Sequence, residues 1–294
     1  MRTLCLGEAL VDMICERRVA GLAEADSFVP HFGGATANVA IRAGGAAALA
    51  GGAGDDPWGA WLRRQLEAAG VDLTWFQLMA RQHTPVAFVA IDGAGDASYQ
   101  IYGDAISMAL DAVADRLIEA VDACDGLFFG SNTLVGERER ELTLAARERA
   151  LDQGTPVVFD PNLRLHRWPD VARAAAESSA CVPDALLVRC NREEAEILTG
   201  EADPEAAGAA LLRTGARTVV VSLGADGAIL RGEARADVPG VPVEVVSTVG
   251  AGDCLMGVLL ARLTEGGYEP SSLVHALPEA VEEAALACTR WGAV

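Results

Sequence analysis

The order of apolar and amphipathic segments constrains the fold of this 294-residue chain more than any other feature. Short apolar segments typical of buried strands alternate with longer segments whose apolar residues recur at helical spacing. This alternation predicts an α/β fold with a mostly parallel, Rossmann-like sheet and helices on both faces. The expected strands are 4–6, 47–50, 126–129, 156–160, 185–189 and 218–222, followed by a β region at 228–246. The expected helices are 35–44, 59–69, 112–121, 138–153, 170–178, 193–198, 205–213, 253–263 and 278–290.

A different pattern interrupts this alternation between residues 84 and 104. Residues 85–91 and 97–102 alternate in polarity, and the intervening Asp-Gly-Ala-Gly-Asp is typical of a turn, so a β-hairpin is expected. An isolated hairpin is only marginally stable, and 11–16 and 27–31 are the best candidates for partner strands. We therefore predict a single domain, 1–294, with a small β-sheet built from inserts at approximately 11–32 and 84–104. Because such a sheet needs cover, a homodimer through it is a further hypothesis.

Composition excludes several classes of protein. The net charge of −19 argues against a general nucleic-acid binder or a partner of anionic membranes. No apolar run reaches the roughly 18 residues needed to span a bilayer, and the start lacks the features of a signal peptide. The seven cysteines are scattered, and the four histidines share no ligand spacing, so we expect no structural metal and no disulfide framework. We expect a cytoplasmic protein.

The chain contains no lysine, because all 23 of its basic residues are arginines. This excludes a P-loop of the Gly-x-x-x-x-Gly-Lys type, a lysine Schiff base and a protein-kinase lysine. A dinucleotide fold is also disfavoured, because Gly-x-Gly-x-x-Gly does not follow the first strand.

A glycine motif near the C-terminus carries the strongest chemical signal. Ser-Thr-Val-Gly-Ala-Gly-Asp at 247–253 places Gly250 and Gly252 before a segment with helical spacing. Glycines allow a sharp turn, and the N–H groups and dipole at a helix N-terminus attract an anion. Asp253 would repel a phosphate, but a carboxylate beside one makes sense as the base that deprotonates an attacking hydroxyl.

Polar clusters follow three other expected strands, at 160–164 (Asp-Pro-Asn-Leu-Arg), 191–194 (Asn-Arg-Glu-Glu) and 222–227 (Ser-Leu-Gly-Ala-Asp-Gly). We interpret 243–246, before the glycine motif, as a fourth such strand. Any one cluster alone is more often an Asx turn or a helix cap. Since a parallel sheet brings the carboxyl ends of its strands to one edge, where ligands bind, four clusters together predict a composite site.

Two glycines also precede the first expected helix. Gly33 and Gly34 lead into it, and Asn38 lies in its first turn. An ordinary helix start is the alternative interpretation. The functional interpretation is that the backbone approaches a hydroxylated ligand, with Asn38 and Asp12 as its hydrogen-bond partners.

These motifs, in this order, resemble the ribokinase-like family of sugar kinases, also called the PfkB carbohydrate kinases. The C-terminal signature of that family is similar to 247–253, and its N-terminal signature is similar to 33–40. Further similarities lie at 54–59, 160–164, 191–194 and 224–227, so the resemblance covers nearly the whole chain. It implies a Rossmann-like domain with a small β-sheet lid that closes over a sugar.

The resemblance also implies a reaction, the ATP-dependent phosphorylation of a primary hydroxyl of a sugar. Asp253 would be the general base, and the backbone of Gly250, Ala251 and Gly252 would form the anion hole. The implied substrate-binding residues are Asp12, Gly33, Gly34, Asn38 and Arg164; the implied nucleotide-binding residues are Asn191, Ser222, Gly224, Asp226 and Gly227. Asn191 and Glu194 would organise Mg²⁺, mostly through water.

Residues 7–12 and 159–164 look most like fructokinases and 2-keto-3-deoxygluconate kinases, and a fructose-like sugar is favoured. Gly103 stands where both subgroups often carry a lid arginine, which weakens the sugar-acid interpretation because a carboxylate substrate favours a bidentate arginine. Ser247 replaces an aspartate that in this family can help to bind a monovalent cation, so a K⁺ requirement stays open. The alternatives are a sugar-acid kinase, a nucleoside kinase or a non-catalytic sugar or nucleotide sensor.

Overall fold

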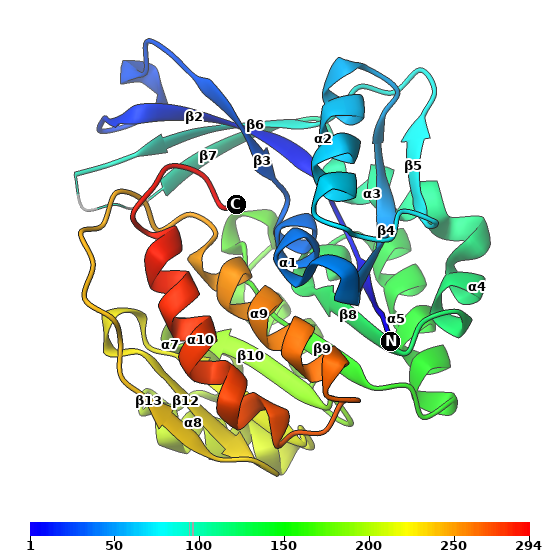
Figure 1. Cartoon of the computed structure of the whole chain (residues 1–294), viewed down its shortest axis with the longest axis vertical. Coiled ribbons are helices and arrows are strands. Elements are labelled where there is room, and N and C mark those ends of the chain that lie inside the picture. The colour runs from blue at the N-terminus through cyan, green and yellow to red at the C-terminus, as the bar shows by residue number, and fades with distance from the viewer. Residues whose placement is uncertain (94, 96) are drawn as a thin grey trace.

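A nine-stranded sheet forms the core of the computed structural model, which describes residues 1–93, 95 and 97–294. Its strands lie in the order β13-β12-β11-β10-β9-β8-β1-β4-β5 (Figure 1). Their bounds are Thr3–Leu6 (β1), Ala47–Gly54 (β4), Phe76–Met79 (β5), Gly126–Gly130 (β8), Val157–Asp160 (β9), Leu187–Asn191 (β10), Thr218–Ser222 (β11), Ala228–Gly232 (β12) and Ala236–Val238 (β13). The seven strands from β5 to β11 in this order run parallel to one another. The pairs β11–β12 and β12–β13 are antiparallel. The predicted α/β class is therefore confirmed.

Helices cover both faces of this sheet (Figure 1). One face carries Ala35–Ala43 (α1), Pro57–Ala68 (α2), Ala251–Glu265 (α9) and Ser272–Ala287 (α10). The other carries Ala105–Val113 (α3), Leu117–Asp122 (α4), Glu137–Asp152 (α5), Val171–Ser179 (α6), Arg192–Thr199 (α7) and Pro204–Thr214 (α8). Successive residues of a strand point to opposite faces of the sheet: Cys5 packs on the α1 side, whereas Leu4 and Leu6 pack on the α3 side. Among the described residues, no helix is long and apolar enough to cross a membrane.

A second, four-stranded sheet, which we call the lid sheet, extends from the carboxyl end of β1 (Figure 1). Its order is β3-β2-β6-β7, with bounds Leu10–Arg18 (β2), Val29–Gly33 (β3), Val86–Ile91 (β6) and Ala97–Tyr102 (β7). The pair β2–β6 is parallel and the other two pairs are antiparallel. The predicted small sheet is thus present, although residues 94 and 96 of its predicted turn lie outside the described residues. The division of the chain into one domain with two inserts stays a prediction.

The predicted helix 112–121 is helical in the structure, but its predicted start and its continuity are wrong. Helix α3 begins seven residues earlier, and a 3₁₀ turn at Ala114–Arg116 separates it from α4. The Asp104 carboxylate accepts a hydrogen bond of 3.0 Å from the N–H of Ser107, so this aspartate caps a helix start that the sequence interpretation did not predict.

The chain before the glycine motif also differs from expectation. The β region ends with β13, and residues 239–246 form a loop, so the fourth predicted polar cluster does not follow a strand. Pro239 and Pro242 lack the N–H that strand pairing requires, which explains the loop. Two smaller differences are the edge strand β5, which was not predicted, and α10, which begins at Ser272 and contains Pro278.

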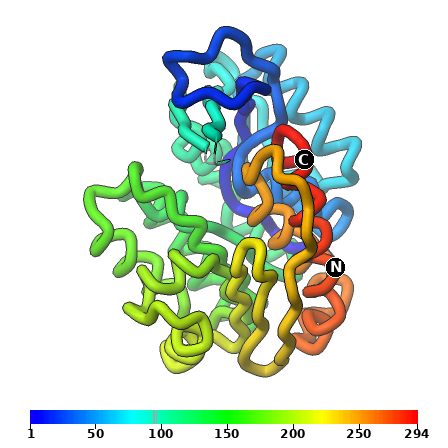
Figure 2. The backbone as a smooth tube through the Cα atoms, turned by 90° about the vertical axis from the view of Figure 1, so that its left-hand side faces the viewer, coloured from blue at the N-terminus to red at the C-terminus, as the bar shows by residue number. Residues whose placement is uncertain are grey.

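The end of the chain packs against the glycine motif and the lid sheet (Figure 2). A Cβ atom at Gly250 would lie 2.2 Å from the Cβ of Ala293, and one at Gly292 would lie 2.5 Å from the His31 ring of β3. Gly250 has a φ of 78°, a conformation that side chains disfavour, so two independent constraints require glycine there. The last residues therefore hold the turn from which α9 begins.

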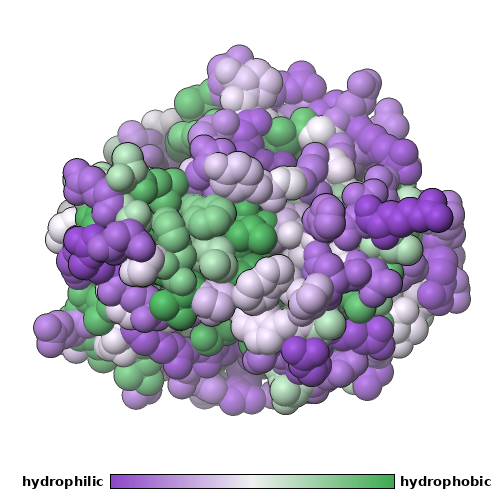
Figure 3. Space-filling model, turned by 90° about the horizontal axis from the view of Figure 1, so that it is seen from above, coloured by the Kyte–Doolittle hydropathy of each residue, from purple (hydrophilic) through white to green (hydrophobic). Residues whose placement is uncertain are grey.

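The face of the lid sheet that points away from the pocket carries aromatic side chains. Phe28, Phe88 and Tyr102 stack edge to face there, and Tyr102 is 60% exposed. Apolar side chains gather on the side of the molecule that carries the lid strands (Figure 3). We expect a second copy to cover this face, so light scattering at micromolar concentration should report a dimer that Tyr102→Glu dissociates. Leu144→Glu, on the exposed face of α5, is the control and should leave the dimer intact. A monomeric wild-type protein would contradict the hypothesis.

Candidate active site

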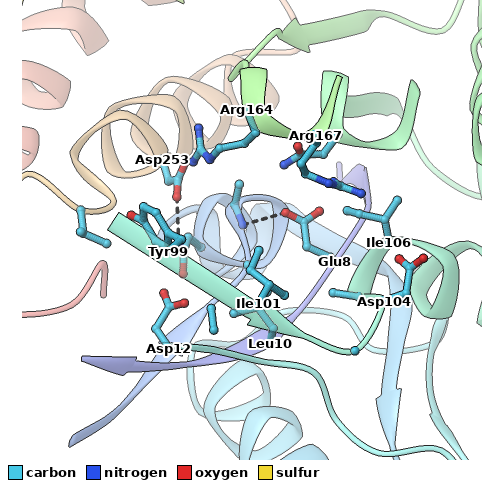
Figure 4. Close-up of a pocket in the computed structure, with 18 of the residues that line it drawn as sticks. Glu8, Leu10, Asp12, Tyr99, Ile101, Asp104, Ile106, Arg164, Arg167 and Asp253 are labelled. Carbon is cyan, nitrogen blue, oxygen red and sulfur yellow. Dashed lines mark hydrogen bonds between the residues drawn. The ribbon is translucent and has the colours of Figure 1, made fainter. Parts of the chain in front are cut away.

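A pocket of about 430 Å³ lies between the lid sheet and the carboxyl edge of the main sheet (Figure 4). Strands β2 and β7, the N-termini of α1, α3 and α9, and the loop after β9 form its walls. Its polar and charged lining residues are Glu8, Asp12, Asn38, Tyr99, Gln100, Asp104, Asn132, Arg164, His166, Arg167 and Asp253. The pocket therefore joins residues from segments that are far apart in the sequence.

Asp253 occupies the first turn of α9 and is buried, and its carboxylate reaches the pocket (Figure 4). Asn38 Nδ2 donates to Asp253 Oδ2 at 2.9 Å, and Asn162 Nδ2 donates to Asp253 Oδ1 at 3.1 Å. Arg164 in turn donates to the side-chain oxygen of Asn162. Each carboxylate oxygen thus has its own amide donor, which fixes the orientation of the carboxylate.

Two carboxylates of the pocket, Asp253 and Asp12, bind protons more readily than free carboxylates do. Burial raises the pKa of Asp253, although Arg164 and the hydrogen bond from Asn38 oppose this increase. Burial, helped by the charge of Asp253, also raises the pKa of Asp12 to about 7. A buried carboxylate with a raised pKa suits a proton acceptor that works near neutral pH.

The start of α9 provides donors for an anion. Among the described residues no side chain caps this helix, so N–H groups of its first turn remain available to a ligand. The N–H of Ala251 makes a 3.3 Å hydrogen bond to the carbonyl of Thr248 within the turn. Gly252 has a different neighbour, because a Cβ there would lie 2.9 Å from Nη1 of Arg189.

The structure brings six of the predicted substrate-side and catalytic residues into the pocket, namely Asp12, Gly34, Asn38, Arg164, Gly250 and Asp253. Ala251 and Gly252 do not line it. Gly33 is not part of its lining; a Cβ there would lie 2.5 Å from the Asp12 carboxyl carbon. The absence of a side chain at Gly33 thus leaves room for the Asp12 carboxylate. Gly34, with a φ of 99°, packs on the backbone of Glu8 while facing the pocket.

Asn191 and Glu194 form a capping box at the start of α7. Asn191 Oδ1 accepts from the N–H of Glu194 at 2.8 Å, and the Glu194 oxygens accept from the N–H groups of Asn191 and Leu163 at 2.9 and 2.7 Å. No group of three or more His, Cys, Asp or Glu side chains in the described part of the chain is placed to hold a metal. The side-chain oxygens of Asn191 and Glu194 each retain a lone pair that can accept a hydrogen bond from water. This donor set therefore fits Mg²⁺ that is bound through its water ligands.

The other predicted nucleotide-side residues lie outside the pocket, at the end of β11 next to β10. The Ser222 hydroxyl accepts from Arg189 at 2.8 Å, and the exposed Asp226 pairs with Arg192 at 3.1 Å. Gly227 has a φ of 98°, and a Cβ there would lie 2.0 Å from the carbonyl oxygen of Val238. Gly224 also has a positive φ, of 63°. These glycines shape the turn that leads into β12.

Sequence reasoning missed several residues of the site. Glu8 accepts hydrogen bonds from the Ala35 N–H at 3.0 Å and from the Thr36 hydroxyl at 3.3 Å, and it lies within the 7–12 motif without having been given a role. Asn162 is the central residue of the 160–164 cluster, so its position was a usable signal. The other missed residues are Tyr99, Gln100, Asp104, Asn132, His166, Arg167 and Arg189. Among these, only Asn132 had a usable signal, because the polar segment 131–133 follows a predicted strand.

Comparison with known proteins identifies the family. The model described as "pfkB family carbohydrate kinase" matches residues 2–294. The chain belongs to this family. It is 33% identical to fructokinase-1 of Oryza sativa subsp. japonica, over 98% of this chain and 92% of the relative.

Two solved structures extend this similarity. A fructokinase double mutant from Vibrio cholerae O395, in a form bound to fructose, ADP and a potassium ion, has a TM-score of 0.84 at 27% identity, covering 99% of this chain and 93% of that one. The aminoimidazole riboside kinase of Salmonella enterica, complexed with aminoimidazole riboside and an ATP analogue, has a TM-score of 0.80 at 27% identity, covering 100% and 95%. The family and ribokinase-like fold that the sequence motifs predicted are confirmed, and this carbohydrate kinase is a sugar phosphotransferase.

The raised pKa of Asp12 predicts a pH-dependent cost in stability. Its pKa rises from 3.8 to about 7 on folding, so stability is lost as pH rises from about 4, where the unfolded chain ionises, to about 7, where Asp12 of the folded protein ionises too. Asp12→Asn removes the ionisation. The Tm of this variant, relative to wild type, should therefore increase between about pH 5 and pH 8 in thermal unfolding scans. Glu141→Gln, an exposed substitution on α5, should show no such trend, and a flat difference for Asp12→Asn would contradict the assignment.

Proposed function

We propose that this kinase transfers the γ-phosphoryl group of ATP to a primary hydroxyl of a sugar, with a fructose-like sugar as the favoured substrate. One observation carries the proposal: the Asp253 carboxylate, fixed by Asn38 and Asn162, lies at the uncapped start of α9 and faces a pocket of sugar size. A base, an anion site and a hydroxyl-binding cavity meet there.

In the proposed mechanism, Asp253 accepts the proton of the sugar hydroxyl as its oxygen attacks the phosphorus atom. The amide donors on both carboxylate oxygens keep Asp253 pointing at that hydroxyl. Backbone N–H groups at Gly250, Ala251 and Gly252, with the dipole of α9, stabilise negative charge on the transferring phosphoryl group. Mg²⁺ bound through water near Asn191 and Glu194 would neutralise phosphate charge.

The charges around the pocket favour a neutral sugar over a sugar acid. Among the described residues, four carboxylates but only two guanidinium groups, those of Arg164 and Arg167, line the pocket. Burial, together with these arginines, lowers the pKa of His166, so this imidazole is neutral near pH 7. Carboxylates accept hydrogen bonds from sugar hydroxyls and repel a substrate carboxylate. A nucleoside kinase is the second candidate, because one similar structure holds aminoimidazole riboside.

Replacement of the proposed base tests the mechanism. Asp253→Asn keeps the size of the side chain but removes the proton acceptor, so we expect kcat to fall by about 10³-fold or more with a normal fold. Steady-state ADP release and circular dichroism measure the two properties. Asp111→Asn, exposed on α3, should retain wild-type kcat. Turnover of Asp253→Asn close to wild type would rule out Asp253 as the base.

A substrate panel tests the specificity. We expect kcat/KM, from ADP release, to be highest for fructose-like sugars and lower for 2-keto-3-deoxygluconate and nucleosides. Arg167→Met should then affect the neutral sugars by less than about tenfold, whereas a sugar acid that relied on this guanidinium would lose far more. A preference for the sugar acid or a nucleoside would select that alternative. Calorimetric binding without turnover of any member would indicate a non-catalytic sensor.

A further inference from the structure

Arg189 is a buried arginine that the proposed mechanism does not use. It lies on β10, is 6% exposed, and its Nη1 donates to Asp160 Oδ2 of β9 at 3.1 Å. Its Nη2 donates to the Ser222 hydroxyl of β11 at 2.8 Å. One guanidinium therefore connects three neighbouring strands at the edge of the sheet where the site lies.

The same guanidinium lies directly behind the anion-binding turn. A Cβ at Gly252 would lie 2.9 Å from Nη1 and 3.0 Å from Nη2, so any larger residue there would displace a guanidinium that is bonded to Asp160 and Ser222. Arg189 Nε is buried and has no hydrogen-bond partner in the described part of the chain. An arginine kept for structure alone would be expected to have all its donors satisfied.

The surroundings of Arg189 are acidic. Its ion-pair partner Asp160 is buried, and Glu194 and Asp253 also interact with it electrostatically. Burial lowers the pKa of Arg189, but the charges of Asp160 and Glu194 raise it by more, so Arg189 remains charged. A buried ion pair is a weak source of stability, because desolvation of both groups offsets most of their attraction. Stability alone therefore does not explain why a charged residue, Arg189, is buried at this position.

We propose that Arg189 is a positioning residue for phosphoryl transfer. Its guanidinium packs against Gly252 and so holds the first turn of α9, with its anion-binding N–H groups, in place. Its positive charge also favours the ionised form of Asp253, which is the form that accepts a proton. Arg189 acts through these groups and not by contact with the substrate. The inference rests on the proposed role of Asp253 as the base.

The ion pair offers a test that separates charge from structure. Arg189→Gln and Asp160→Asn break the same ion pair, so both variants should lose stability. Their electrostatic effects on Asp253 are opposite. Arg189→Gln removes a cation that opposes the rise in the pKa of Asp253, whereas Asp160→Asn removes a carboxylate that repels Asp253 whenever it is ionised and leaves Arg189 uncompensated.

The measurement is the pH dependence of kcat/KM for the wild type and the two variants. We expect the acid limb to move to higher pH in Arg189→Gln and to lower pH in Asp160→Asn. At neutral pH, kcat of Arg189→Gln should fall about tenfold, less than the loss for a donor that touches the oxyanion directly. Arg189→Lys, which keeps the charge, should return the acid limb toward its wild-type position.

Acid limbs that move in the same direction, or that do not move in either variant, would overturn the proposal and leave Arg189 a structural role. If Arg189→Gln does not fold, the double variant Arg189→Gln with Asp160→Asn supplies a neutral amide pair in its place. Its acid limb should lie above that of Asp160→Asn, and an equal position would count against the proposal. Asp253→Asn in the same series tests the base itself: a kcat close to the wild-type value there would remove the proposed function, whatever Arg189 does, and an acid limb that persists at a much reduced kcat would belong to Asp12.

Discussion

The close packing of α1 against α9 is the constraint on which the site depends. A Cβ at Gly257 of α9 would lie 2.5 Å from Arg42 Cβ and 2.8 Å from the carbonyl oxygen of Val39, so only glycine permits this separation of the helices. Asn38 precedes Val39, and Asp253 lies one turn before Gly257 on the same side of α9. The 2.9 Å hydrogen bond between Asn38 and Asp253, across 215 positions of sequence, follows from that approach.

Electrostatics explains how an acidic chain without lysine can handle phosphate. The net charge of −19 repels anions at long range, and the pocket itself carries more carboxylates than guanidinium groups. Attraction must therefore be local, from oriented N–H groups at the start of α9 and from arginines that lie within or behind the site. Salt screens the surface charges far more than these buried groups, so the local field dominates where the reaction takes place.

Much of the fold was predictable because each buried strand and each amphipathic helix has its own local period in the sequence. The errors arose at local signals that this period does not carry: the Asp104 cap at the start of α3 was not recognised, and prolines keep 239–246 out of the sheet. Motif residues such as Asp12, Asn38 and Asp253 were predictable because glycines or polar clusters mark them. Arg189 was not, because it lies within the apolar strand β10 and its partners come from strands distant in the sequence. Asn132 was overlooked, although it belongs to the polar segment 131–133 that follows a predicted strand.

The glycines show why local sequence could locate the site without describing its construction. Gly33 and Gly252 were both interpreted as places where the backbone approaches a ligand. In the structure, the space that each missing side chain leaves is taken by a charged group of this chain, the Asp12 carboxylate at Gly33 and the Arg189 guanidinium at Gly252. A glycine that admits a ligand and a glycine that admits a charged side chain look identical in sequence. Here the second kind places a carboxylate beside the pocket and a cation behind the anion-binding turn, so the same glycines that shape the backbone also set the charge of the site.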